Sequence, residues 1–152
     1  MPACAIVGIC AAGACAIAMA AAVACDLRTR TIPVAACGAL ALAGGVFRAC
    51  ADGAAGVAAG ALYGIVFVAV CRLANRLPRR GGSNPVGAGD IRCMGALSLA
   101  SGAYAPLGFA ACYGAAACAA LAGLASRRVS LQDDIPMAPF LALWLVCAVL
   151  CR

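Results

Sequence analysis

The sequence predicts an all-α, polytopic membrane protein with about six transmembrane helices. Of its 152 residues, 66% are hydrophobic and only 11% are charged, whereas soluble domains are about a quarter charged. So few polar side chains cannot cover a water-soluble protein. The apolar residues fall in runs near the length that crosses a bilayer, and none alternates like a membrane strand. Helices satisfy their own backbone hydrogen bonds in lipid, so we expect helices.

Each apolar segment predicts one helix, and together they form a single membrane-embedded domain over residues 1–152. The six segments run from about Ala3 to Cys25, Val34 to Phe47, Ala54 to Cys71, Ile91 to Ala100, Ala103 to Ala125 and Pro136 to Cys151. The fourth is short. No basic residue precedes the first, and its apolar run is too long for a signal peptide, so we expect a transmembrane helix there.

The arginines predict the orientation of these helices. They gather in the first, third and fifth connections, at Arg28, Arg30, Arg72, Arg76, Arg79, Arg80, Arg92, Arg127 and Arg128, and the other side has only Arg48 and Arg152. Basic connections stay in the cytoplasm. We therefore expect a multi-pass protein of the cytoplasmic (inner) membrane with both termini outside. The Arg72–Arg80 cluster is explained by this topology and by attraction to anionic lipid headgroups.

Composition also limits the chemistry available to the chain. There are twelve cysteines and no histidine, and no CxxC pair occurs. We interpret the cysteines as small apolar packing residues and expect no metal, no cofactor and no nucleic-acid partner. Gly56, Gly60 and Gly64 form a GxxxGxxxG ridge that favours close helix packing. The alternative is that glycine is merely common in membrane helices.

Two of the five acidic residues are expected at the same membrane face. Asp26 ends the first helix, which runs inward, and Asp90 begins the fourth, which runs outward. Two carboxyl groups held close together cannot both ionise at low cost, so one keeps its proton. The ionised carboxylate can activate a water molecule, and the protonated one can donate a hydrogen bond to a peptide carbonyl. Together they can hydrolyse a peptide bond without a metal. Gly87 and Gly89 leave room for a substrate backbone beside Asp90.

Structural explanations remain open for each acidic residue. Asp90 is alternatively an N-cap of the fourth helix, and Asp26 an ordinary interface residue beside arginines. Asp133 and Asp134 are best explained as a cap before the sixth helix. Asp52 lies in an Asp-Gly turn on the opposite face.

The motifs around the two aspartates resemble those of type IV prepilin and preflagellin peptidases, a family of GxGD intramembrane aspartyl proteases. Asp26-Leu-Arg28-Thr-Arg-Thr-Ile-Pro33 matches the family's first site, and Gly87-Ala-Gly89-Asp90-Ile-Arg92 matches its second. The segment Ile135–Leu143 is similar to the family's last helix. The resemblance covers most of the chain, in order and in topology.

The resemblance implies an aspartic-type endopeptidase that removes the basic leader from prepilin-like proteins at the cytoplasmic membrane face. Asp26 and Asp90 are then the catalytic pair. Gly87, Gly89, Arg28, Pro33 and Arg92 shape the site or bind substrate. The paired CxxC region linked to N-methylation in longer members has no counterpart, so we expect no methyltransferase activity, as in short members that serve Flp/Tad-type pili.

Two departures from the family pattern bear on this hypothesis. Val34 stands where the family often has Asn, which removes a polar group near the site. Arg92, Cys93 and Met94 replace a lysine and leucines, and arginine keeps the charge but not the shape of lysine. The competing hypotheses are an inactive family member and a small transporter or assembly subunit whose two aspartates bind a cation or protons.

Overall fold

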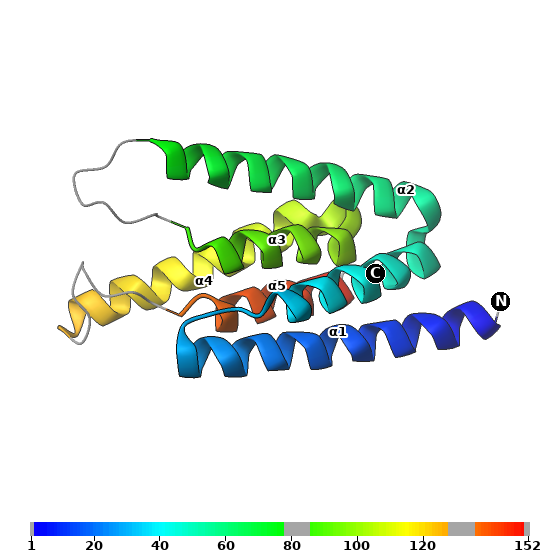
Figure 1. Ribbon diagram of the computed structural model, residues 1–152, viewed down its shortest axis with the longest axis horizontal. Coiled ribbons are helices and arrows are strands. Elements are labelled where there is room, and N and C mark those ends of the chain that lie inside the picture. The colour runs from blue at the N-terminus through cyan, green and yellow to red at the C-terminus, as the bar shows by residue number, and fades with distance from the viewer. Residues whose placement is uncertain (1, 78–85, 128–135, 151–152) are drawn as a thin grey trace.

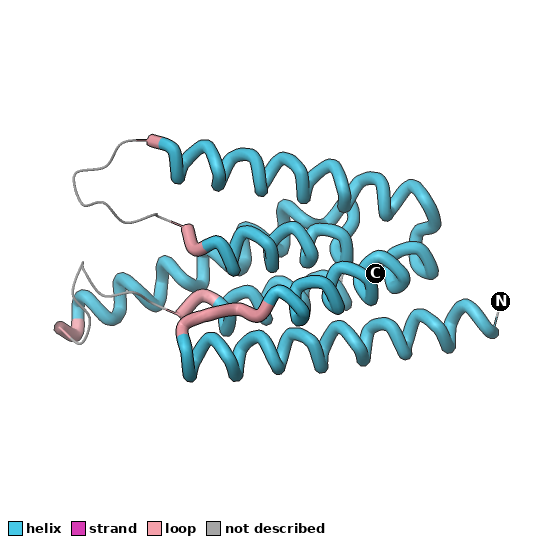
Figure 2. The backbone as a smooth tube through the Cα atoms, viewed as in Figure 1, coloured by secondary structure: helices cyan, strands magenta, loops and turns pink. Residues whose placement is uncertain are grey.

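A computed structural model describes residues 2–77, 86–127 and 136–150, and all of the regular structure in them is helical. The elements are α1 (Pro2–Thr29), α2 (Val34–Arg76), α3 (Ala88–Ser101), the short 3-10 helix η1 (Gly102–Tyr104), α4 (Ala105–Ala125) and α5 (Ala138–Leu150). The tube in Figure 2 shows that, apart from a few short loop segments, the described residues are helical. The predicted all-helical class is therefore confirmed for the described residues.

Helix α2 contains both the second and the third predicted segments. Gly53 interrupts it with φ 67° and ψ −157°, a conformation that glycine adopts at low cost and other residues do not. The chain reverses at this point, so the two parts of α2 run in opposite directions (Figure 1). The predicted Asp52-Gly53 turn is thus confirmed.

The helices form an elongated bundle whose two ends collect different parts of the sequence. The C-terminal end of α1 and the first residues of α2, α3 and α5 lie at one end, on the left in Figure 1. The N-terminus, the Gly53 turn and the C-terminal ends of α3 and α5 lie at the other. This arrangement places Asp26 and Asp90 at the same end.

Helix α3 packs against α2, α4 and α5 and is largely buried. The glycine ridge of α2 makes this close packing possible. A Cβ atom on Gly60 would lie 2.5 Å from the carbonyl oxygen of Ser98, and one on Gly64 would lie 3.3 Å from that of Gly95. The predicted use of the ridge for close helix packing is confirmed.

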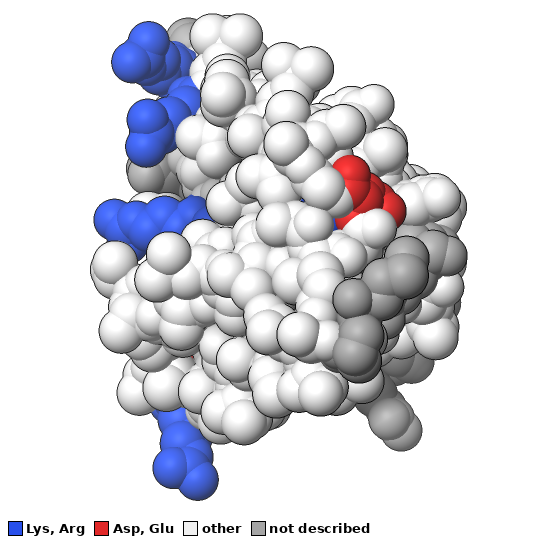
Figure 3. Space-filling model, turned by 90° about the vertical axis from the view of Figure 1, so that its right-hand side faces the viewer, with Lys and Arg blue, Asp and Glu red and all other residues white. Residues whose placement is uncertain are grey.

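The exterior of the bundle is compatible with a membrane protein. Three helical stretches, Ala3–Thr29, Val34–Arg76 and Ala88–Ala125, are long and apolar enough to span a bilayer, and α5 is a shorter apolar helix. Large apolar side chains such as Ile17, Leu42 and Leu121 are exposed. In the end view of Figure 3 most of the surface is neither basic nor acidic: most basic atoms lie along one edge and at the bottom, and one acidic patch lies on the opposite side.

Candidate functional site

Asp26 lies in the last turn of α1 and is only 6% exposed. Its Oδ2 accepts a hydrogen bond of 3.1 Å from the backbone N–H of Ala138. Ala138 is the first residue of α5, and N–H groups in the first turn of a helix have no partner within the helix. Asp26 therefore meets the N-terminus of α5, a contact across the bundle that the motif Ile135–Leu143 did not indicate by itself.

Asp90 is the third residue of α3, and the N-cap position belongs to Gly87. The Asp90 carboxylate accepts a hydrogen bond from the backbone N–H of Gly87, which is the reciprocal half of a capping box. The alternative that Asp90 is itself the N-cap is wrong in register. Its carboxylate nevertheless supports the start of α3.

The two aspartates line one cavity of about 330 Å³. The lining residues come from the end of α1, the loop that follows it and the start of α3, and they are Asp26, Arg30, Thr31, Ile32, Gly87, Ala88, Gly89, Asp90 and Arg92. Two carboxyl groups from distant parts of the sequence thus face a shared space. Such a pair can divide its roles, with one member ionised and the other protonated.

The two glycines before Asp90 contribute in different ways. A Cβ atom on Gly87 would lie 2.8 Å from Oδ2 of Asp90, so any side chain there would press on the carboxylate. The backbone of Gly87 is extended, with φ −63° and ψ 144°, and does not itself require glycine. A Cβ atom on Gly89 would lie 3.1 Å from the Cβ of Ile32, so Gly89 lets α3 approach the α1–α2 loop.

The other predicted site residues divide between the cavity and its surroundings. Arg92 is exposed and lines the cavity. Arg28 is exposed, and Pro33 is the N-cap of α2, and neither lines the cavity. Val34 is also exposed and outside the lining. Val34 in place of a polar residue therefore takes no polar group from the cavity wall.

Arg30 is a cavity residue that the candidate site did not include. It has a left-handed backbone with φ 55°, which is uncommon for a residue other than glycine. Its N–H donates to the carbonyl oxygen of Asp26 at 2.9 Å, so the chain turns sharply just after the aspartate. The repeated basic pattern of Arg28-Thr-Arg30 was the available signal.

Asn75 is a second residue that sequence reasoning missed. From the end of α2, its side chain donates to the carbonyl oxygen of Val86 at 2.9 Å and accepts from the N–H of Val86 at 3.2 Å. Val86 directly precedes Gly87, so this pair of bonds fixes the chain as it enters α3. A lone amide near the end of an apolar helix was the only signal.

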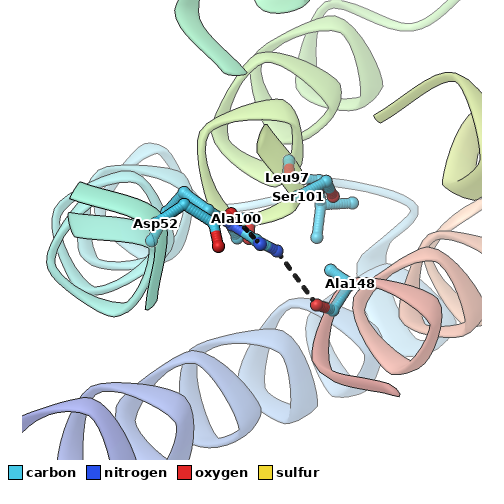
Figure 4. A network of polar contacts seen from close by, with 6 residues as sticks. Asp52, Leu97, Ala100, Ser101 and Ala148 are labelled. Atoms are coloured by element: carbon cyan, nitrogen blue, oxygen red, sulfur yellow. Dashed lines mark hydrogen bonds and ion pairs between the residues drawn. The ribbon is translucent and has the colours of Figure 1, made fainter. Parts of the chain in front are cut away.

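A second polar cluster, centred on Arg48, lies at the other end of the bundle. The prediction made for Arg48 is wrong in one respect. Arg48 was expected in the connection on the outer face, but it is completely buried. Its guanidinium donates to the carbonyl oxygens of Ala100 and Ala148 at 3.0 and 3.1 Å and pairs with Asp52 at 2.7 Å. Figure 4 shows these groups converging from α2, α3 and α5. The sequence placed Arg48 next to a turn and gave no sign of its partners.

Two further predictions concern Asp133 and Asp134 and the absence of a metal site. Asp133 and Asp134 lie outside the described residues. Within the described ranges, no group of three or more His, Cys, Asp or Glu side chains is placed to hold a metal ion.

Comparison with known protein families, curated proteins and solved structures finds no match to this chain. The resemblance to prepilin peptidases therefore rests on the motifs around Asp26 and Asp90.

Proposed function

We propose that this chain is a membrane aspartyl endopeptidase that removes the basic leader from prepilin-like precursors. The observation that carries the proposal is that Asp26 and Asp90, from different helices, line the same cavity. The motif resemblance selects the same two residues from the five acidic residues of the chain. Geometry and sequence thus support one pair by independent arguments.

The proposed reaction uses the two carboxyl groups in complementary states. The ionised carboxylate takes a proton from a water molecule, and the resulting hydroxide adds to the scissile carbonyl carbon. The protonated carboxyl donates to the carbonyl oxygen, which gives a neutral tetrahedral intermediate. When this collapses, the first carboxyl returns its proton to the leaving nitrogen, and the second carboxylate takes a proton back from one hydroxyl, so that the amine and the new carboxylic acid are released.

The proposed membrane arrangement brings the substrate to this cavity. In this arrangement the chain crosses the cytoplasmic membrane six times, and both termini lie outside. The two parts of α2 count as separate spans, and α3 is the short fourth span. The aspartate end of the bundle then faces the cytoplasm, where the arginines of the first, third and fifth connections lie. A prepilin helix stays in the bilayer while its leader reaches the cavity. Arg28 and Pro33 shape the entrance, and Arg92 lies on the wall.

The position of the pair argues against the competing transporter hypothesis. A carrier of cations or protons places its acidic residues near the bilayer midplane. Asp26 lies in the last turn of α1 and Asp90 in the first turn of α3. Both are therefore at one end of the bundle.

A cleavage assay tests the proposal. The chain is co-expressed with a prepilin-like protein from the same genome, and leader loss is followed by gel shift. Asn keeps the size of Asp but cannot act as base or acid, so Asp26→Asn and Asp90→Asn should each slow cleavage by about a thousandfold or more. Asp52→Asn, at the other end of the bundle, is the matched control and should cleave like wild type.

The outcomes distinguish catalysis from structural support. Each variant must insert and resist unfolding like wild type, because both carboxylates also bond the start of a helix. Normal cleavage by either variant would remove that residue from the mechanism. A wild-type chain that cleaves no prepilin-like substrate but moves protons across vesicles would favour the transporter.

A further inference from the structure

A groove lies along the outside of the bundle between the second part of α2 and α3. It has a volume of about 700 Å³ and a mainly apolar lining. Glycine is present on both walls: Gly64 and Gly95 both line the groove, and a Cβ atom on Gly64 would lie 3.3 Å from the carbonyl oxygen of Gly95. No side chain from either residue fills the space above that contact. The groove is separate from the cavity of the two aspartates.

One end of the groove is basic. Arg72 and Arg76 line it and are exposed, and they lie one helical turn apart on the same face of α2. No hydrogen bond or ion pair holds either guanidinium among the described residues. The groove therefore combines an apolar channel with two cationic groups at one mouth.

The length of the apolar part matches one leaflet of a membrane. From Ala61 to Arg72 an α-helix rises about 16 Å. The hydrocarbon core of a bilayer is about 30 Å thick, so that one leaflet is about 15 Å. An acyl chain that starts at the level of Arg72 would end near Ala61. A transmembrane helix, in contrast, needs a surface that continues through both leaflets.

We propose that this groove binds an anionic phospholipid, with its phosphate on Arg72 and Arg76 and an acyl chain along Ile65 and Val68. Basic pockets between helices on the cytoplasmic side of membrane proteins bind such headgroups. The site is independent of peptidase activity and needs only that the chain lies in a membrane. The lipid covers Gly95 and Leu99 of α3, so it also stabilises the packing of α3 on α2.

The test compares two lipids with identical acyl chains, phosphatidylglycerol and phosphatidylcholine. The full chain is purified, delipidated in a neutral detergent and titrated with each lipid, and binding is read by native mass spectrometry and by the thermal midpoint. Wild type should bind phosphatidylglycerol on the order of tenfold more tightly. This preference should shrink as salt is raised, because exposed charges are screened.

Two variants separate the headgroup contact from the groove. Arg72→Gln with Arg76→Gln should reduce the preference to about twofold or less while phosphatidylcholine binding stays unchanged. Ala69→Phe places a ring in the groove and should weaken both lipids. The control for the arginine variant is Arg127→Gln with Arg128→Gln, which removes the same amount of charge outside α2. The control for Ala69→Phe is Val66→Phe, which adds a ring to α2 outside the groove lining. Both controls should bind like wild type.

The proposal is overturned if wild type binds the two lipids equally, or if the arginine variant keeps the preference. It is also overturned if Ala69→Phe binds both lipids normally but loses self-association or substrate binding, because the groove would then hold a protein helix. Since the readout is lipid binding, these results stand whether or not the chain cleaves prepilins.

Discussion

The end of the bundle that holds Asp26 and Asp90 differs from the end that holds Arg48 in how its buried charge is paired. The Arg48 guanidinium is surrounded by two carbonyl oxygens and the Asp52 carboxylate. Asp26 and Asp90 each meet a backbone N–H and also face a cavity. A guanidinium whose three nitrogens each have a partner holds structure together, whereas carboxylates open to a cavity remain available for chemistry.

Removal of Arg48 should have the largest effect on stability in this comparison. Arg48→Met leaves two carbonyl oxygens without their donor and Asp52 without its cation. We expect a loss of about 3 kcal/mol in the free energy of unfolding, measured by denaturation in mixed micelles. Because the cavity lies at the other end, any protein that remains folded should keep its cleavage rate.

The double variant Arg48→Met with Asp52→Asn sharpens this prediction. It removes the unpaired carboxylate as well and should recover part of the lost stability. If Arg48→Met unfolds like wild type, the Arg48 cluster has no structural role and the contrast between the two ends fails.

The glycine ridge between the two ends should give the next largest effect. A Cβ atom on Gly60 would lie 2.5 Å from the Ser98 carbonyl oxygen, so Gly60→Ala should cost about 1–3 kcal/mol of unfolding free energy. Gly38 has nothing within 4 Å, and Gly38→Ala is the matched control. It should be neutral or stabilise by up to about 1 kcal/mol, since alanine favours helix. Equal effects at both positions would mean that α2 and α3 are not packed this closely.

Asn75 should affect the aspartate end alone. Asn75→Ala removes both bonds to Val86, so we expect a loss of about 1–2 kcal/mol and roughly tenfold slower cleavage from a poorly placed Asp90. Asn75→Asp keeps the acceptor for the Val86 N–H and should lie between alanine and wild type in cleavage rate. A change in stability without any change in the cleavage rate would show that Asn75 does not position the site.

Asp52 should give the smallest effect. Its side chain is 42% exposed, and solvent weakens the ion pair it forms, so Asp52→Asn should cost about 1 kcal/mol or less. The measurement is the same denaturation in micelles. A loss as large as that of Arg48→Met would show that the ion pair, and not the two carbonyl contacts, dominates the cluster.

The sequence predicted the helices well because apolar runs and charged connections report directly on membrane crossing. It also predicted that Asp26 and Asp90 lie at the same end, since antiparallel helices return to the same end, and both residues line one cavity there. It could not predict the burial of Arg48, because its partners Ala100 and Ala148 offer only backbone carbonyls. Every residue carries the same backbone groups, so contacts made by them cannot be predicted from residue types. For the same reason the sequence did not predict the hydrogen bond from the Ala138 N–H to Asp26.

The pairing of Arg48 with Asp52 has a consequence for how the chain enters a membrane. The two residues lie one turn apart in the same helical stretch, so they can pair before α3 and α5 have been synthesised. In the proposed orientation this stretch is carried across the bilayer. A lone arginine is costly at the bilayer centre, but the pair has no net charge. In that orientation Asp52 would neutralise Arg48 during translocation, and the backbone carbonyls of α3 and α5 would bind the guanidinium once the bundle closes.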